Sequence, residues 1–370
     1  MLKNILTRGH FARALAALLL LCTIQTAARA QGLGVGSGVG PGTPPAHVAL
    51  INRLVAATDE RERERLLEEN KDSLTPEFVD DLLERGRALQ EQAKSQELFQ
   101  LYGLGHRIAT RIGYKKGTAR SLKGLGEHYF TRGDYARALE YAGEMRKLYE
   151  ELGDKWGIAA AHVAVGLVSH NRGDYARAMA DYEKALELLR EVGNDDSIAY
   201  LLNNMGDVHR LRGEHDRALE LFRQSLKMEE ELGHKLRVAG VLNNMGIAYR
   251  NSGRVKEALE VYQRSLAISG ELNNKRDMGG TLNNIGVIHA TEGRRDEALA
   301  HFRQSLGYFE EIGFKLGIAA TLTSIGNIYK EQGKREQAAD YYRRSLKLRE
   351  EMGDAAAAKN LKALIKSVTR

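Results

Sequence analysis

The sequence repeats itself with a period of forty residues, and this period constrains the fold more than any other feature. Similar segments begin at positions 132, 172, 212, 252, 292 and 332, with no insertion or deletion between them. The segments are RGDYARALEYAGEM, RGDYARAMADYEKAL, RGEHDRALELFRQSL, SGRVKEALEVYQRSL, EGRRDEALAHFRQSL and QGKREQAADYYRRSL. A fixed period of this length is typical of solenoids, in which each repeat packs only against its neighbours.

Composition favours helix over strand in the repeated part. All four prolines of the 370-residue chain precede Glu77, and aromatic residues make up only 6%. Proline breaks helix interiors, so its absence from a long stretch is compatible with helix throughout. Sheet proteins are enriched in aromatic and β-branched residues instead. The sequence therefore predicts an all-α chain and argues against the all-β and α/β classes.

Each repeat divides into two helices, and the first carries a glycine at its centre. These glycines are Gly126, Gly166, Gly206, Gly246, Gly286 and Gly326. An apolar residue usually stands four residues earlier, and a tyrosine or histidine usually stands three residues later, which places all three on one helical face. Glycine inside a helix costs about 1 kcal/mol relative to alanine. We therefore predict that a partner helix approaches this face closely.

The second helix supplies that partner face and ends in a recognisable way. A small alanine is followed four residues later by an aromatic ring in five of the six repeats, at Tyr182, Phe222, Tyr262, Phe302 and Tyr342. The helix end is marked by a glycine, which asparagine replaces at position 273. Asparagine tolerates the left-handed conformation next best after glycine. The pattern predicts a left-handed helix cap at this place in every repeat.

These small and aromatic places resemble the tetratricopeptide repeat (TPR) family. The forty-residue period and the LNNMG and LNNIG segments are similar to the variety found in kinesin light chains and Pins-type G-protein signalling modulators. The chain lacks the proline of the common 34-residue form. The resemblance implies a right-handed α-solenoid of helix-turn-helix repeats, in a bacterial exported TPR protein.

The repeats divide the chain into segments. Six full repeats cover 119–358, and 79–118 is predicted to be a degenerate repeat because Gly86, Leu98 and Tyr102 stand at matching places. Residues 359–370 are expected to form a capping helix with a charged outer face. Residues 46–78 are expected to form short helices, with Pro76 opening the next one.

The first thirty residues have the features of a secretory signal peptide. Basic residues come first, an apolar core runs from 14 to 24, and Ala28-Arg29-Ala30 provides small residues for cleavage after Ala30. Retention of this segment as an anchor is the alternative, although a spanning helix needs about twenty apolar residues. We expect export to the periplasm or secretion, followed by a Gly/Pro-rich linker at 31–45.

The charge and the cysteine content exclude several kinds of function. The formal net charge is +6, but four basic residues lie in the predicted signal peptide, and the remainder has 51 basic and 49 acidic residues, or +2. Such a balance does not favour nucleic-acid binding. Cys22 is the only cysteine and also lies in the signal peptide. The mature chain would therefore have no disulfide and no cysteine-based site.

The sequence predicts no catalytic residue, no metal site and no cofactor. No His-Glu-x-x-His, Gly-x-Ser-x-Gly or P-loop pattern is present. His209 and His289 share a place with tyrosines of other repeats, so we interpret them as residues at the edge of the core. The Glu-Glu pairs recur with the repeat, and we interpret them as a solvated face.

Polar residues of the first helices are the candidate binding site. Places beside the glycine face turn about 100° away from it, toward the predicted inner groove. The candidates are Asn203, Asn204, Asn243, Asn244, Asn283, Asn284, Arg210, Arg250, Asn327 and Lys330. One hypothesis is that the asparagine amides hold the backbone of an extended peptide, since each amide is both donor and acceptor. The alternative is that they bond to the neighbouring repeat and fix its register.

The resemblance implies a non-enzymatic scaffold that binds a peptide or protein in the groove of the superhelix. The basic members of the site would favour an acidic or carboxylate-bearing partner. The alternative is a regulatory or sensor subunit for a protease, kinase or cyclase on a separate chain. The partner's identity, the pathway and the oligomeric state stay open at this point.

Overall fold

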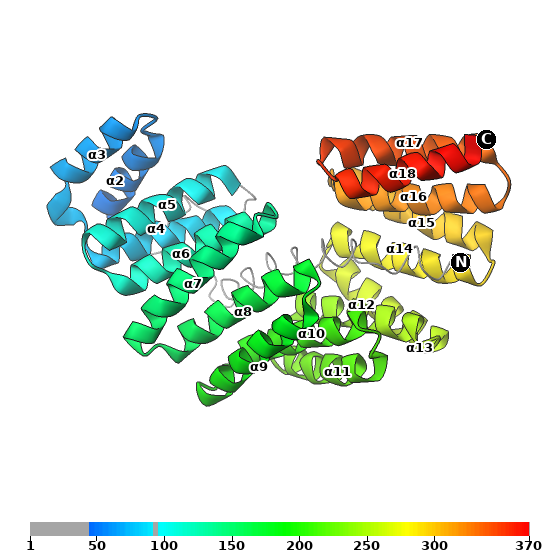
Figure 1. Ribbon diagram of the computed structural model, residues 1–370, viewed down its shortest axis with the longest axis horizontal. Helices are drawn as coiled ribbons and strands as arrows, with labels where there is room; N and C mark the ends of the chain where they lie inside the picture. The colour runs from blue at the N-terminus through cyan, green and yellow to red at the C-terminus, as the bar shows by residue number, and fades with distance from the viewer. Residues whose placement is uncertain (1–43, 92–94, 370) are drawn as a thin grey trace. The chain divides into compact units, whose positions relative to one another are not determined.

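The computed structural model describes residues 44–91 and 95–369, which form seventeen α-helices and one short 3-10 helix (Figure 1). No strand occurs in this part of the chain, so the all-α prediction is confirmed. The predicted signal peptide and most of the predicted linker lie outside the described residues. The chain divides into two compact halves, Met1–Leu201 and Leu202–Arg370, and α10 (Asp195–Leu211) contains the division.

The N-terminal half consists of short helices followed by helix pairs. Its elements are α2 (Pro45–Ala56), α3 (Glu60–Glu69), η3 (Lys71–Ser73), α4 (Pro76–Glu91), α5 (Ser95–Arg111), α6 (Lys115–Thr131), α7 (Tyr135–Leu152), α8 (Lys155–Arg172) and α9 (Tyr175–Glu191). Pro76 is the first residue of α4, as predicted. Pro45, the last residue of the predicted linker, instead begins α2, where its missing N–H leaves no hydrogen bond unmade.

The C-terminal half repeats one helix pair. After the second part of α10 it contains α11 (His215–Glu231), α12 (Lys235–Asn251), α13 (Val255–Glu271), α14 (Lys275–Thr291), α15 (Arg295–Glu311), α16 (Lys315–Glu331), α17 (Arg335–Glu351) and α18 (Ala355–Thr369). We call the first helix of each repeat the A helix and the second the B helix. The helix α18 begins four residues before the predicted capping segment and buries Ala358, Leu361 and Val368.

The glycines of the A helices lie directly against the aromatic rings of the B helices. A methyl group added at Gly246 would stand 2.3 Å from Cε1 of Tyr262, and one at Gly286 would stand 2.7 Å from Cε1 of Phe302. Real contacts are longer than this, so only glycine allows the ring to sit there. At Gly126 the nearest atom is 3.4 Å away, since alanine replaces the aromatic ring in that repeat. The predicted close approach of the two helices is confirmed.

The B helices end in a left-handed residue, as predicted. Asn273 has φ 49°, and among the described residues no other non-glycine has a positive φ. At the end of α7, Gly153 N–H donates to Glu150 O at 3.1 Å and Asp154 N–H donates to Tyr149 O at 3.0 Å. These two bonds are those of the Schellman motif, which satisfies carbonyl groups at a helix end.

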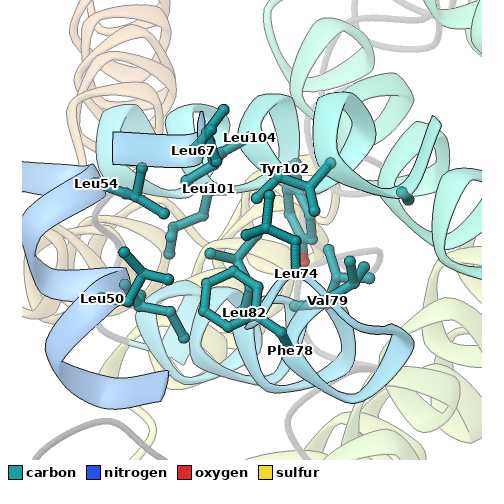
Figure 2. Packing of buried hydrophobic residues seen from close by; sticks show 14 of the residues in the cluster. Leu50, Leu54, Leu67, Leu74, Phe78, Val79, Leu82, Leu101, Tyr102 and Leu104 are labelled. Atoms are coloured by element: carbon teal, nitrogen blue, oxygen red, sulfur yellow. The ribbon is translucent and has the colours of Figure 1, made fainter. Parts of the chain in front are cut away.

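The first helices of the N-terminal half share one apolar core (Figure 2). Leu50 and Leu54 of α2 and Leu67 of α3 pack against Phe78 of α4 and Leu101 of α5. The helices α4 and α5 begin about forty residues before α6 and α7. A methyl group added at Gly86 of α4 would lie 3.5 Å from the ring of Tyr102 and 3.5 Å from the side chain of Leu98, both on α5. The short helices α2 and α3 therefore cover apolar surface that a preceding repeat would otherwise bury.

Candidate functional site

The six candidate asparagines lie on neighbouring A helices, and four of them bond to one another in two pairs. Asn244 Nδ2 donates to Asn203 Oδ1 at 3.0 Å, and Asn284 Nδ2 donates to Asn243 Oδ1 at 2.9 Å. All six residues are less than 10% exposed. Sequence reasoning placed these side chains on the open groove, whereas the structure places them between helices. The bonds are those that the register hypothesis requires.

The asparagine ladder is incomplete at its C-terminal end. Asn283 Oδ1 is buried and accepts no hydrogen bond from any described residue. Ser324 stands where the next asparagine of the ladder would be, and its Oγ donates to Ala320 O at 3.3 Å instead. A buried acceptor without a partner costs free energy, so this end of the ladder is weaker than its centre.

The charged candidates differ in how accessible they are. Arg210 is 9% exposed, and its Nε donates to Asp207 Oδ1 at 2.7 Å. Arg250 is half-buried, and its one side-chain hydrogen bond in the described part of the chain is a long one, 3.4 Å from Nη2 to Asn251 Oδ1. Lys330 is exposed, and Asn327 is half-buried. Arg250, Asn327 and Lys330 are therefore the members that a partner can reach most readily.

Two tyrosines that sequence reasoning assigned only to the core also reach this region. The Tyr342 hydroxyl donates to Asn327 Oδ1 at 2.7 Å. Ile247 occupies the place of Asn327 two repeats earlier, so the equivalent Tyr262 cannot form that bond. The Tyr262 hydroxyl is buried and has no hydrogen-bond partner among the described residues. Burial raises the pKa of Tyr262 to about 12, while the charges of Arg250 and Arg210 act in the opposite direction.

Four histidines of the described residues either face a carboxylate or stack against one another. His209 Nδ1 lies 2.6 Å from Glu214 Oε2, and His162 Nδ1 lies 2.9 Å from Asp181 Oδ1. His289 and His301 stack with ring centroids 5.0 Å apart and an angle of 9° between the rings. Burial lowers the pKa of both rings.

One interface between repeats carries a buried ion pair that sequence reasoning missed. Glu229 is 1% exposed, and its Oε2 lies 2.9 Å from Nε of Arg237, which is 4% exposed. At the same place in another repeat, the ring of Phe309 packs against Gly317. Sequence reasoning assigned the following Glu230-Glu231 pair to solvent, and both residues are exposed. Position 229 therefore holds an acidic residue where the other repeat has an aromatic ring, and position 237 holds a basic residue where it has glycine. These two opposite charges were the feature of the sequence that could have indicated the ion pair.

Two further kinds of site were searched for in the described residues. No group of three or more histidine, cysteine, aspartate or glutamate side chains there could hold a metal ion. No helix in that part of the chain combines the length and the apolar character needed to cross a membrane.

Solved structures with the same arrangement of helices include aspartyl phosphate phosphatase F from Bacillus subtilis, which is 12% identical, with 91% of this chain and 90% of that chain covered and a TM-score of 0.62. A Rap protein complexed with competence and sporulation factor is 13% identical, with 88% and 98% covered and a TM-score of 0.58. The putative kinesin light chain repeats of Podosopora anserina are 16% identical, with 54% and 98% covered and a TM-score of 0.42. A search among curated proteins gave no match.

The sequence also matches a family model directly. The model described as tetratricopeptide repeat matches residues 157–231, 211–271, 237–306 and 277–351, which together span more than half of the chain. The predicted helix pairs, glycine contacts and helix caps all occur in the matched region. The chain belongs to the tetratricopeptide repeat family.

Proposed function

We propose that the chain is a non-enzymatic scaffold that binds an acidic peptide or protein segment on the A-helix face of its C-terminal half. The A-helix face is defined here as Arg210, Arg250, Asn327 and Lys330 together with the asparagine ladder. One observation carries the proposal: within the described part of the chain Arg250 and Lys330 form no ion pair, and the side-chain hydrogen bond of Arg250 goes to the neutral Asn251. Most other charged side chains of these helices do form pairs, such as Lys235 with Glu271 at 3.0 Å. Unpaired cations on one face favour a partner that supplies the carboxylates.

The asparagines support this face in two ways. Their mutual hydrogen bonds hold neighbouring A helices in register, which fixes the positions of the basic side chains. In the described part of the chain, Asn243 uses its Oδ1 to accept from Asn284, and no residue accepts a bond from its Nδ2. We infer that this N–H group, on a side chain 9% exposed, is offered to a backbone carbonyl of the partner.

Family membership supports the class of function, because TPR proteins bind protein or peptide partners. A Rap protein of similar fold has been solved in complex with competence and sporulation factor. The regulatory alternative would be favoured by recovery of a protease, kinase or cyclase as the partner.

The test is a pull-down followed by titration of the recovered partner. The bait is the purified chain, compared with the double variant Arg250→Glu/Lys330→Glu. The matched control is Lys227→Glu/Lys347→Glu, which makes the same charge change at exposed positions on the B helices. We expect the partner to bind the control and to be lost from the A-helix variant. A partner that binds both variants equally would place the binding surface elsewhere.

We also propose that the chain is exported and cleaved after Ala30. The basic start, the apolar core at 14–24 and the small residues Ala28 and Ala30 support this proposal. Residues 1–45 fused to a reporter that is active only outside the cytoplasm should give activity, and bulky residues at 28 and 30 should block processing. Recovery of the chain from the cytoplasm with Met1 intact would contradict export.

A further inference from the structure

We propose that one side of α18 is a docking surface for an acidic α-helix of a partner protein. This side, which we call the lysine face, consists of Lys359, Lys362 and Lys366. All three lysines are exposed, and their spacing of three and then four residues places them on one side of the helix. None of them belongs to the A-helix face, so this inference does not depend on the proposed function.

The lysine face lies on the side where an A helix receives its B helix. Forty residues earlier, the same three places of α16 hold Ala319, Leu322 and Gly326. The helix α17 packs on that side of α16, where Ser345 Oγ donates to Ala319 O at 2.7 Å. A methyl group added at Gly326 would stand 2.7 Å from Cε1 of Tyr342 on the same helix. Three lysines in α18 therefore replace the small and apolar residues that pack against a helix in α16.

The remaining sides of α18 suit the approach of a second helix. The helix lies beside α17 at the end of the C-terminal half (Figure 1) and buries Leu361 and Val368 in a cluster with Tyr342. Next to the lysine face, Ala356 and Ala363 are exposed, so no large side chain there holds a second helix at a distance. Among the described residues, the exposed large apolar side chains all lie outside α18, so this helix has none to insert into a membrane.

The charge of the lysine face is largely uncompensated. The helix α18 contains no acidic residue. Lys362 Nζ lies 2.7 Å from Glu350 Oε1, whereas Lys359 and Lys366 form no ion pair within the described part of the chain. An anionic partner that supplies carboxylates is therefore complementary to this face.

The short helix α3 shows that a polar outer helix of this chain does not need unpaired charges. Arg63 Nη1 lies 3.1 Å from Glu60 Oε2 within α3, and Arg107 Nη1 of α5 lies 3.1 Å from Glu64 Oε1 of α3. A terminal repeat requires a polar outer face for solubility, and paired charges provide one. Solubility alone therefore does not account for the lysine face.

The spacing of the lysines specifies the pattern of the partner. Lys359 and Lys366 are seven residues apart, which corresponds to about 10 Å along the helix axis. Neighbouring helices of one repeat run antiparallel, so the partner helix would present the same spacing in reverse order. We therefore expect glutamates at positions i, i+4 and i+7 of the partner helix.

The experiment is an NMR titration of the isotopically labelled full chain with a stapled helical peptide, rich in alanine, that has glutamates at i, i+4 and i+7. The control peptide has the same composition, with the glutamates distributed around the helix. We expect saturable shifts of the α18 backbone amides and a larger dissociation constant for the control peptide.

Variants of the chain locate the binding. Lys359→Gln/Lys366→Gln should raise the dissociation constant by about tenfold at low salt, because two ion pairs at an exposed surface are lost. The effect should shrink at high salt, which screens such pairs. Lys227→Gln/Lys256→Gln removes two exposed lysines from the B helices and should leave the constant unchanged.

Four outcomes would overturn the proposal. Equal binding of the two peptides would show attraction by charge without a docked helix, and an unchanged constant for Lys359→Gln/Lys366→Gln would place the peptide elsewhere. Tighter, lysine-dependent binding to phosphatidylglycerol vesicles than to the peptide would assign the face to lipid. A dimer in sedimentation that Lys359→Gln/Lys366→Gln converts to monomer would assign it to a second copy of the chain.

Discussion

Tyr262 and Tyr342 occupy the same place in their repeats, but among the described residues the Tyr342 hydroxyl has a hydrogen-bond partner and the Tyr262 hydroxyl has none. Tyr342→Phe removes that bond and should lower the free energy of unfolding by about 0.5–1.5 kcal/mol. Tyr262→Phe removes an unsatisfied buried hydroxyl and should leave the stability unchanged or slightly higher. Urea denaturation of both variants checks this difference. Equal losses in the two variants would mean that the Tyr262 hydroxyl is bonded in solution.

The open end of the asparagine ladder can be closed by one substitution. Ser324→Asn places an amide beside Asn283 Oδ1, which has no donor among the described residues, as Asn244 and Asn284 do for their neighbours. A new buried hydrogen bond should raise the unfolding free energy by about 0.5–1.5 kcal/mol.

Ser324→Ala is the control for this change, because it removes the serine hydroxyl without adding an amide. A thermal midpoint of Ser324→Asn no higher than that of Ser324→Ala would show that the ladder does not stabilise the array.

At the scale of elements, α14 and α15 meet through two stacked histidines where other repeats have stacked tyrosines. The Tyr129–Tyr141 centroids are 5.5 Å apart and the Tyr329–Tyr341 centroids 5.4 Å apart, close to the 5.0 Å of His289–His301. Burial lowers the pKa of both histidines; Arg294 and His301 also lower that of His289, while Glu292 and Glu297 raise it. A histidine ring can take up a proton in mild acid, whereas a phenol ring has no group that does so.

A lowered histidine pKa makes stability depend on pH. In acid the unfolded chain binds protons that the folded pair resists, so the stability contributed by the pair is complete above about pH 6.5 and declines as the pH falls below it. The double variant His289→Tyr/His301→Tyr should lose less stability between pH 7.5 and pH 5 than the parent chain. Thermal melts across this range provide the measurement, and parallel losses in the two proteins would show that the stack does not titrate.

At the scale of the whole molecule, each repeat contacts only its neighbours, so local damage should spread along the array. Gly246→Ala would put a methyl group 2.3 Å from the Tyr262 ring, and the overpacking should cost roughly 1–3 kcal/mol. Gly280→Ala, also inside an A helix, meets nothing within 4 Å and should stabilise by up to about 1 kcal/mol.

Hydrogen exchange checks how far the damage extends. Gly246→Ala should lower protection in α11 to α14, beyond its own helix pair, whereas Gly280→Ala should not lower protection anywhere. Loss confined to α12 and α13 would mean that the repeats fold independently.

The repeat allowed most of the fold to be predicted from the sequence. The glycine at the centre of each A helix, the ring opposite it and the left-handed Asn273 were all predicted correctly. Each depends on neighbours within one repeat, and the same arrangement recurs about forty residues further on. Helix capping and close packing depend on residues within one repeat. The caps and the glycine contacts can therefore be recognised in the sequence, because the same residues recur in each repeat.

For the candidate site, the sequence indicated which residues to consider but not the contacts that they make. Asn244 bonds to Asn203, forty-one residues earlier, and this bond decides that the asparagines lie between helices. Glu229 is buried because Arg237, on the next A helix, is buried beside it. Within the part of the chain that the structure describes, the Tyr262 hydroxyl has no partner, because position 247 holds isoleucine where the equivalent position 327 holds asparagine. The sequence by itself determined the repeat, the helix pairs and their caps, because these depend on nearby residues. Only the tertiary structure decided which polar groups form hydrogen bonds with one another, because those partners belong to neighbouring helices and differ from repeat to repeat.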